Sequence, residues 1–331
     1  MKKLICGPMA TISHPAFRIL IEKFGGCDEY FTEMINAGSL LTQGPFEKYY
    51  IDSTPVPEKL VWQLTGHDKK NMVEAARFLC DLPVLGLDIN MGCSAPDIYK
   101  TGAGIGWMLK PMEETMDMVK GISDVLANKN SSMRLSVKLR LGDENFKDED
   151  FFKFALALSE NGVQLLTLHP RTKKEKLARP ARYKYCEQLA QLMSEKNIPV
   201  YLNGNVKDRA SYEYAVSQAP DCEGVMIARA SVQKPWIFSE IKGSLSPTHT
   251  QVDMQDLAME YISLVEKYQP QEFWKTRLQR FFSYYPMNFK FGHYAQSSFL
   301  NAKNNEDLRK KIEEFFYKCP EERFLSRASA L

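Results

Sequence analysis

Short apolar segments alternate with amphipathic ones along the first 230 residues of the chain. Runs rich in aliphatic and β-branched residues, most ended by a glycine or a polar residue, are typical of buried strands. They lie at residues 4–6, 29–34, 60–64, 85–89, 135–141, 165–168, 200–202 and 224–227. Helical periodicity separates most of these runs, at 71–80, 113–127, 150–161, 183–196 and 208–218. Eight strand–helix units over about 240 residues predict an α/β fold, a closed (β/α)8 TIM barrel.

The alternation stops after Pro235, and residues 245–250 are typical of a linker. Residues 252–317 show mostly helical spacing of apolar positions. We therefore predict a barrel domain at 1–242 and a small helical domain at 251–331. An aromatic run at 281–285 is suited to stacking on bases, but such runs more often belong to a core, so we expect it to be buried.

Composition adds three expectations. The length of 331 residues exceeds the usual size of one core, which suits a barrel with an appended domain. The seven cysteines include no C-x-x-C pair, so we expect free thiols and neither a disulfide framework nor a structural zinc site. The first twenty residues lack an apolar run long enough for a signal peptide or a membrane span. We expect a cytoplasmic protein, monomeric and not bound to a membrane.

Charge is unevenly distributed although the net charge is only +2. Residues 271–331 carry eleven Lys or Arg against seven Asp or Glu, which leaves 32 against 34 for residues 1–270. A denser basic cluster at 171–184 contains seven Lys or Arg and a single acid, Glu175. Such clusters are usually solvated surface, but a basic loop together with a basic tail is also typical of a protein that binds nucleic acid.

Polar side chains follow nearly every predicted strand, and barrel enzymes carry their active sites at these strand ends. In chain order they include Glu33, Gln63, Asn90 with Cys93, Lys138 with Arg140, His169 with Arg171, Asn203 and Arg229. A lone Cys93 would more often be a core residue. So many polar strand ends converging on one barrel mouth instead favour a ligand site there.

The last two strand ends indicate phosphate binding, which barrels commonly place after strands seven and eight. Asn203-Gly204-Asn205 offers close backbone approach, and Arg229 offers positive charge. Gln63 and Lys138 would then face a planar heterocycle, and the combination describes a site for flavin mononucleotide (FMN). Residues 102–106, Gly-Ala-Gly-Ile-Gly, do not match the dinucleotide fingerprint, and we interpret them as a flexible loop that could close over a substrate.

Several motifs occur together in one order: Pro8-Met9-Ala10, Asp88-Ile89-Asn90-Met91-Gly92-Cys93, Ser136-Val137-Lys138-Leu139-Arg140, His169-x-Arg171-Thr172, Asn203-Gly204 and Gly224-Val225-Met226-Ile227-Ala228-Arg229. In this order they resemble the tRNA-dihydrouridine synthase family. The resemblance extends from residue 7 to about residue 238, and Arg277 with Tyr284-Tyr285 resembles the helical tail of that family more weakly.

The resemblance implies FMN-dependent reduction of the C5=C6 bond of uridine in tRNA, with NADPH as the reductant. Cys93 would be the proton donor, and a cysteine with an ordinary pKa of about 8.5 is mostly protonated at neutral pH. Asn90, Arg140 and Arg171 would contact the uridine. The residues that the resemblance assigns to FMN are Pro8, Met9, Ala10, Gln63, Lys138, His169, Asn203, Gly204, Asn205, Ala228 and Arg229.

The chain departs from the family pattern at several positions. Pro170, Ala228 and Ala230 stand where glycines are usual, Ser94 where proline is, Leu177 where an aromatic residue is, and His14 where an aspartate is. Two other interpretations stay open. One is an FMN barrel that acts on a free pyrimidine, and the other is a noncatalytic barrel that binds RNA. The sequence leaves open which tRNA position is modified and whether NADPH or NADH is preferred.

Overall fold

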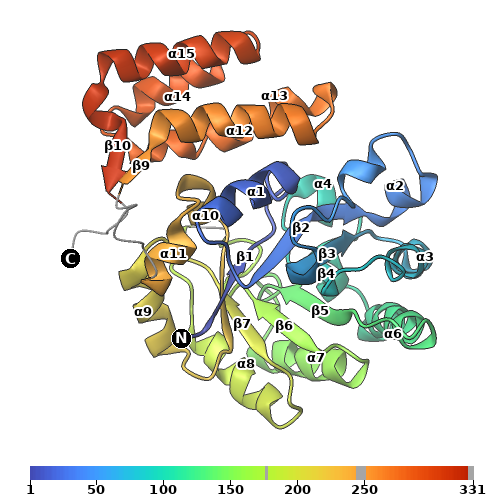
Figure 1. The fold of residues 1–331 in the computed structure, drawn as a ribbon. Coiled ribbons are helices and arrows are strands. Elements are labelled where there is room, and N and C mark those ends of the chain that lie inside the picture. The colour runs from blue at the N-terminus through green and yellow to red at the C-terminus, as the bar shows by residue number, and fades with distance from the viewer. Residues whose placement is uncertain (176–177, 244–250, 327–331) are drawn as a thin grey trace.

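The first part of the chain forms a closed barrel of eight parallel strands (Figure 1), in a computed structural model that describes residues 1–175, 178–243 and 251–326. The strands follow the chain order around the barrel, and β8 closes onto β1. They are β1 Lys3–Cys6, β2 Glu29–Asn36, β3 Leu60–Thr65, β4 Gly86–Met91, β5 Arg134–Leu139, β6 Leu165–Leu168, β7 Val200–Asn203 and β8 Gly224–Ile227. The predicted TIM barrel is confirmed.

Helices cover the outside of the barrel between successive strands (Figure 1). Their starts follow local chemistry: α1 begins at Pro15, a residue favoured in a first turn, and Asp208 and Ser211 form a capping box at the start of α9. The helices are α1 Pro15–Lys23, α2 Ala37–Thr42, α3 Lys69–Leu79, α4 Pro96–Tyr99, α5 Gly106–Leu109, α6 Met112–Asn128, α7 Asp148–Glu160, α8 Lys184–Ser194, α9 Arg209–Gln218, α10 Arg229–Gln233 and α11 Ile237–Lys242.

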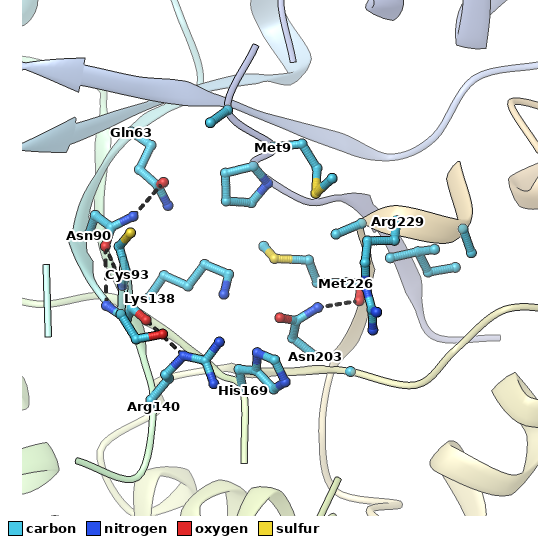
Figure 2. A pocket seen from close by; sticks show the side chains of 18 of the residues that line it. Met9, Gln63, Asn90, Cys93, Lys138, Arg140, His169, Asn203, Met226 and Arg229 are labelled. Atoms are coloured by element: carbon cyan, nitrogen blue, oxygen red, sulfur yellow. Dashed lines mark hydrogen bonds between the residues drawn. The ribbon is translucent and has the colours of Figure 1, made fainter. Parts of the chain in front are cut away.

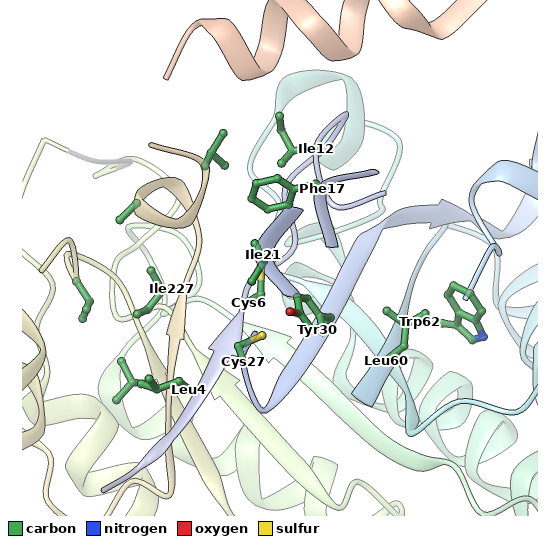
Figure 3. Packing of buried hydrophobic residues seen from close by; sticks show 14 of the residues in the cluster. Leu4, Cys6, Ile12, Phe17, Ile21, Cys27, Tyr30, Leu60, Trp62 and Ile227 are labelled. Carbon is green, nitrogen blue, oxygen red and sulfur yellow. The ribbon is translucent and has the colours of Figure 1, made fainter. Parts of the chain in front are cut away.

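Alternation along each strand divides the core into two layers. Outward side chains pack beneath the helices, as Figure 3 shows for Cys6 of β1 beside Ile21 of α1. Inward side chains fill the barrel itself, and this inner cluster consists of Ile5, Phe31, Val61, Leu165, Tyr201 and Met226. The inner layer supports the strand ends from below, so the polar residues that follow it rest on a packed floor.

A largely buried ion pair closes the end of the barrel where the strands begin. The two terminal nitrogens of Arg134, the first residue of β5, lie 3.1 and 2.6 Å from the carboxylate oxygens of Glu29, the first residue of β2. The Tyr201 hydroxyl donates to the same carboxylate at 2.7 Å. Glu29 is therefore fully engaged inside the protein.

The helical region consists of α12 Met254–Tyr268, α13 Gln271–Phe282, α14 Gly292–Leu300 and α15 Asn305–Lys318. A short antiparallel pair that the sequence did not predict, β9 Gln251–Asp253 with β10 Phe324–Ser326, joins its two ends. Phe281, Phe282 and Tyr285 are buried among other rings, so the expected core role is confirmed for these three, whereas Tyr284 is only partly buried. The predicted linker at 245–250 lies outside the described residues.

Glu33 joins the barrel to the helical region instead of facing the mouth with the other strand ends. Its carboxylate accepts a hydrogen bond from Arg277 of α13 at 2.6 Å, with both side chains buried, and another from the Thr11 amide at 2.8 Å. The β2–β3 register shifts between Phe31 and Met34. An irregularity of this kind breaks the inward–outward alternation, which explains why the sequence pattern misplaced Glu33.

The glycine-containing segment at 102–106 is packed, so its interpretation as a flexible loop was wrong. Ala103, Ile105 and Trp107 are buried, and the Ile105 amide donates to the Cys93 carbonyl at 3.0 Å. Gly104 has φ +58°, and a Cβ there would lie 2.7 Å from that same carbonyl oxygen. Glycine is needed here for close approach beneath Cys93. Within the described residues, no helix combines the length and the apolar character that crossing a membrane requires.

Candidate functional site

A cavity of about 890 Å³ opens at the carboxyl ends of the strands (Figure 2). All but one of the fifteen residues that the family resemblance assigns to the site line it: Pro8, Met9, Ala10, Gln63, Asn90, Cys93, Lys138, Arg140, His169, Asn203, Gly204, Asn205, Ala228 and Arg229. The helical region supplies a further wall, from Arg280, Tyr284 and Met287. Sequence reasoning missed this wall because it depends on how the two parts of the chain pack together.

Among the positively charged side chains that line the cavity, Lys138, Arg140 and Arg229 lie at strand ends and have no acidic partner among the described residues. Lys138 extends into the open space (Figure 2), where burial and the nearby charge of Arg140 lower its pKa to about 8. Arg140 donates through Nε to the Gly92 carbonyl at 2.8 Å, which leaves its buried Nη1 atom without a partner in the described chain. Arg229 is exposed at the cavity. These groups suit a ligand that brings negative charge or carbonyl oxygens.

The strand ends of β7 and β8 form the opposite side of the cavity. The Asn203 amide donates to the Met226 carbonyl at 2.8 Å, which fixes the side chain across the two strands (Figure 2). Gly204 adopts φ +124°, and a Cβ there would lie 3.3 Å from the His169 ring and 3.4 Å from Arg171. This backbone can therefore come closer to a ligand than one that carried a side chain.

Arg171, the one residue of this set that does not line the cavity, lies behind His169. The residue is 1% exposed, and its guanidinium donates to the Arg179 carbonyl and to Asn205 Oδ1, each at 2.6 Å. Its third contact is with His169 Nε2 at 2.7 Å. In this arrangement Arg171 supports the site from behind, whereas the resemblance implied a contact with the substrate.

The contact between Arg171 and His169 decides the state of the imidazole. Arginine can only donate, so His169 Nε2 must accept, and the ring proton then resides on Nδ1. Burial, followed by the positive charges of Lys138, Arg140, Arg171 and Arg229, lowers the pKa of His169 far below its usual range. His169 is a neutral ring at the cavity wall whose remaining polar group is a donor.

Cys93 is half-buried at the cavity wall and is held through its backbone. Asn90 Oδ1 accepts hydrogen bonds from the amides of Gly92 at 3.2 Å and Cys93 at 2.9 Å (Figure 2). The Asn90 Nδ2 group donates to Gln63 Oε1 at 2.8 Å. The thiol therefore sits on a turn whose position depends on side chains from β3 and β4.

Two departures from the family pattern concern the loop after β6. Pro170 has no backbone N–H, and its carbonyl accepts from the Arg182 amide at 3.3 Å, so the loop folds back on itself at that point. Leu177 lies outside the described residues.

Comparison with known proteins identifies the family. A family model described as dihydrouridine synthase (Dus) matches residues 4–329. The chain belongs to the dihydrouridine synthase family. As a dihydrouridine synthase it is an enzyme, an oxidoreductase, which argues against the noncatalytic interpretation.

Named relatives of this dihydrouridine synthase extend over most of its length. A probable tRNA-dihydrouridine synthase of Aquifex aeolicus is 27% identical over 318 residues, covering 94% of this chain and 95% of the relative. A tRNA-dihydrouridine(47) synthase [NAD(P)(+)]-like protein of Xenopus tropicalis is 32% identical over 242 residues, covering 72% of this chain and 36% of that protein. Among solved structures, an old yellow enzyme homologue from Zymomonas mobilis covers 82% of this chain and 94% of its own, with TM-score 0.50 and 11% identity. That likeness concerns the barrel fold.

Proposed function

We propose that this dihydrouridine synthase reduces uridine in tRNA to 5,6-dihydrouridine, with FMN as its cofactor and NADPH as its reductant. The observation that carries the proposal is the cavity itself: positive groups without acidic partners and N–H donors surround it, in a chain whose relatives are named tRNA-dihydrouridine synthases. In this proposal the enzyme is a cytoplasmic monomer. Its barrel, residues 1–242, binds FMN, and its helical region, residues 251–331, contacts tRNA.

The residues at the cavity fit FMN. Its phosphate would bind near Asn203, Gly204 and Arg229, where glycine backbone and a guanidinium meet. Its ring system would lie against Gln63 and Lys138, because the carbonyl oxygens of the ring need donors and its negative charge needs a cation. Pro8, Met9, Ala10, His169, Asn205 and Ala228 would complete the contacts. When bound, FMN supplies the two-electron chemistry that carries hydride from NADPH to C6 of the uracil ring.

The side chains of the protein would donate the proton and bind the substrate. Cys93 Sγ would hold the proton destined for C5, and Asn90 would keep this thiol in place through the Cys93 amide. Arg140 has one buried Nη1 atom available for a carbonyl oxygen of the uracil. The Lys138 ammonium would stabilise the negative charge that develops as the double bond is reduced.

A uridine must leave the stacked RNA to enter a cavity at the mouth of a barrel. The flanking phosphates would then lie over the basic loop at 171–184 and the helical region, which adds net positive charge. Arg280 and Tyr284 border the cavity from α13 and the turn after it, so the RNA chain would pass between the two parts of the protein.

Binding and product analysis test this proposal. Affinity for tRNA should fall steeply with salt concentration because bound cationic side chains displace counterions from phosphates. Reversing Lys173 and Lys174 to glutamate should weaken tRNA binding and lower the salt slope by about two, while NADPH oxidation by the flavoprotein stays unchanged. A matched control reverses Lys69 and Lys120, which form ion pairs with Asp117 and Asp124 on the flank of the barrel.

Product analysis separates the alternatives. Dihydrouridine should appear in tRNA and not in free uridine or uracil. Reduction of the free pyrimidine, with tRNA affinity that is flat between low and moderate salt, would identify a small-molecule enzyme instead. A purified protein that takes up no FMN would contradict the cofactor assignment.

A further inference from the structure

The middle of the barrel contains a carboxylate for which the proposed reaction has no use. Asp88 lies on β4 below the cavity, is 0% exposed, and occupies the same register level as Gln63 of β3 and Ser136 of β5. We propose that Asp88 is a positioning residue that aligns Cys93 through a directed chain of side-chain amides. The proposal rests on the proposed role of Cys93 as the proton donor.

Both oxygens of Asp88 accept hydrogen bonds from neighbouring strands. Gln63 Nε2 donates to Oδ2 at 2.8 Å, and the Ser136 hydroxyl donates to Oδ1 at 2.7 Å. An ionised carboxylate can only accept, so Gln63 must turn its NH2 group toward Asp88. The carboxylate thereby fixes the orientation of the Gln63 side-chain amide.

The orientation of the Gln63 amide fixes that of the Asn90 amide, which holds the turn that carries the Cys93 thiol. With its NH2 group at Asp88, Gln63 presents Oε1 to Asn90, and Asn90 Nδ2 donates to it at 2.8 Å. Asn90 must then present Oδ1 to the Gly92 and Cys93 amides, which is the arrangement observed. If both amides reversed, the Asn90 NH2 group would face two N–H donors and neither hydrogen bond could form.

Protonation of Asp88 removes the negative charge that fixes the orientation of the Gln63 side-chain amide. A neutral carboxyl can donate as well as accept, so both orientations of the Gln63 amide become possible. Burial raises the pKa of Asp88 to about 6, and the hydrogen bonds from Gln63 and Ser136 together with the charges of Lys138 and Arg134 oppose this rise. The group is charged above about pH 6 and neutral below it, so the turn should lose its anchoring as the pH falls through that value.

Backbone amide signals of the cysteines provide a readout that needs neither substrate nor turnover. Labelling with ¹⁵N-cysteine gives seven amide signals, one for each cysteine, and Cys93→Ser identifies the relevant one. In the parent flavoprotein, the Cys93 signal should titrate with a midpoint near pH 6. In Asp88→Asn that titration should disappear, and hydrogen exchange at the Cys93 amide should accelerate by about tenfold at pH 7.5, the factor expected for one lost hydrogen bond.

A second variant keeps the proposal testable if Asp88→Asn fails to fold. Ser136→Ala removes one hydrogen bond to the charged carboxylate of Asp88, which raises the pKa of that carboxylate. The pH midpoint reported by the Cys93 amide signal should therefore move to higher pH. Asp117→Asn, a surface carboxyl paired with Lys69, is the matched control and should leave the midpoint unchanged. A Cys93 signal that does not titrate, or that titrates with the same midpoint in Asp88→Asn or Ser136→Ala, would overturn the proposal.

The rate of flavin oxidation by tRNA supplies the link to function. Its acid limb near pH 6 should be present in the parent, displaced to higher pH in Ser136→Ala and absent in Asp88→Asn. Failure of the proposed function would remove the reaction with tRNA but leave the amide titration intact. An intact reaction whose pH profile is unaffected by either substitution would contradict the positioning role alone.

Discussion

Charged groups are buried at both ends of the barrel, but in the described part of the chain they form an ion pair at one end and lack an acidic partner at the other. At the end where strands begin, the Glu29 carboxylate pairs with Arg134 and accepts from the Tyr201 hydroxyl at 2.6–3.1 Å. The charge of Arg134 is thereby neutralised, although its Nε atom has no hydrogen-bond partner in the described chain. At the mouth, Lys138 extends into the cavity with no acidic partner among the described residues, and Arg140 keeps a buried nitrogen unpartnered there. The closed end contributes to the fold. Within the residues described, the mouth keeps positive charge without an ion-pair partner, which suits a negatively charged ligand.

This difference has a thermodynamic consequence. A buried cation without an ion-pair partner destabilises the folded protein. The lowered pKa of Lys138 is the sign of that cost, because burial and the charge of Arg140 lower this pKa more than the charge of Asp88 raises it. An anionic ligand at the mouth would offset it, so binding and stability should be coupled there and independent at the closed end. Substitutions at each end can separate the two effects.

The largest effect is expected on catalysis at the mouth. Cys93→Ala should lower the rate of dihydrouridine formation in tRNA by about a hundred- to ten-thousand-fold, because a positioned proton donor contributes that much. The variant should still bind FMN and oxidise NADPH. Single-turnover oxidation of the flavin by tRNA measures the effect, with Cys319→Ala in the helical region as the control. Equal rates in Cys93→Ala and the parent would mean that another group donates the proton.

A substitution at the closed end should change the free energy of unfolding and leave FMN affinity unchanged. Glu29→Gln should lower the free energy of unfolding by about 3 kcal/mol, because it leaves Arg134 without its ion-pair partner. Urea denaturation measures the change, and Glu223→Gln, which breaks an exposed pair with Lys3, should cost less than about 1 kcal/mol. FMN affinity should stay at the parent value in both variants. A weakened flavin complex in Glu29→Gln would show that the two ends are not independent.

Removing the cation at the mouth should raise the free energy of unfolding, whereas Glu29→Gln should lower it. Lys138→Met should stabilise the FMN-free protein by roughly 1–3 kcal/mol at pH 7, because the folded state no longer has to hold a buried charge. The pKa of Lys138 is about 8 in the folded protein and near 10.5 in the unfolded chain. Between these values the unfolded state binds the extra proton, so the parent gains stability as pH rises and the difference between the two proteins shrinks.

Urea denaturation of FMN-free protein between pH 7 and pH 10 measures this trend. The same substitution should weaken FMN binding. A Lys138→Met variant less stable than the parent at pH 7 would show that the ammonium stabilises the fold, and the contrast between the two ends would fail.

The features that the sequence predicted well depend on regular geometry. The apolar strand runs identify the barrel, and because the carboxyl ends of parallel strands meet at one mouth, residues as distant as Gln63 and Arg229 could be grouped from the sequence alone. Family resemblance then implied roles that spacing alone cannot, and the role of Cys93 as a proton donor stays a prediction.

The errors arose where the local pattern does not determine the contact. A register shift turned Glu33 toward Arg277, which no alternation rule predicts. Residues 102–106 have the composition of a loop, yet close approach to the Cys93 carbonyl holds them in the core. Arg171 and Asp88 act through neighbours on other strands and loops, Asn205 and Gln63, so their contacts appear only once the barrel is closed.

The most direct test of the central claim compares FMN with riboflavin, which lacks the phosphate, in the parent and in Arg229→Ala. Dissociation constants come from flavin fluorescence, with Arg209→Ala as the control because that side chain is paired with Glu213 away from the cavity. If the mouth holds its charge for the ligand phosphate, the parent should prefer FMN by at least tenfold, and Arg229→Ala should lose about 1.5–3 kcal/mol toward FMN but little toward riboflavin. A preference for FMN that is equally large in both proteins would contradict the account.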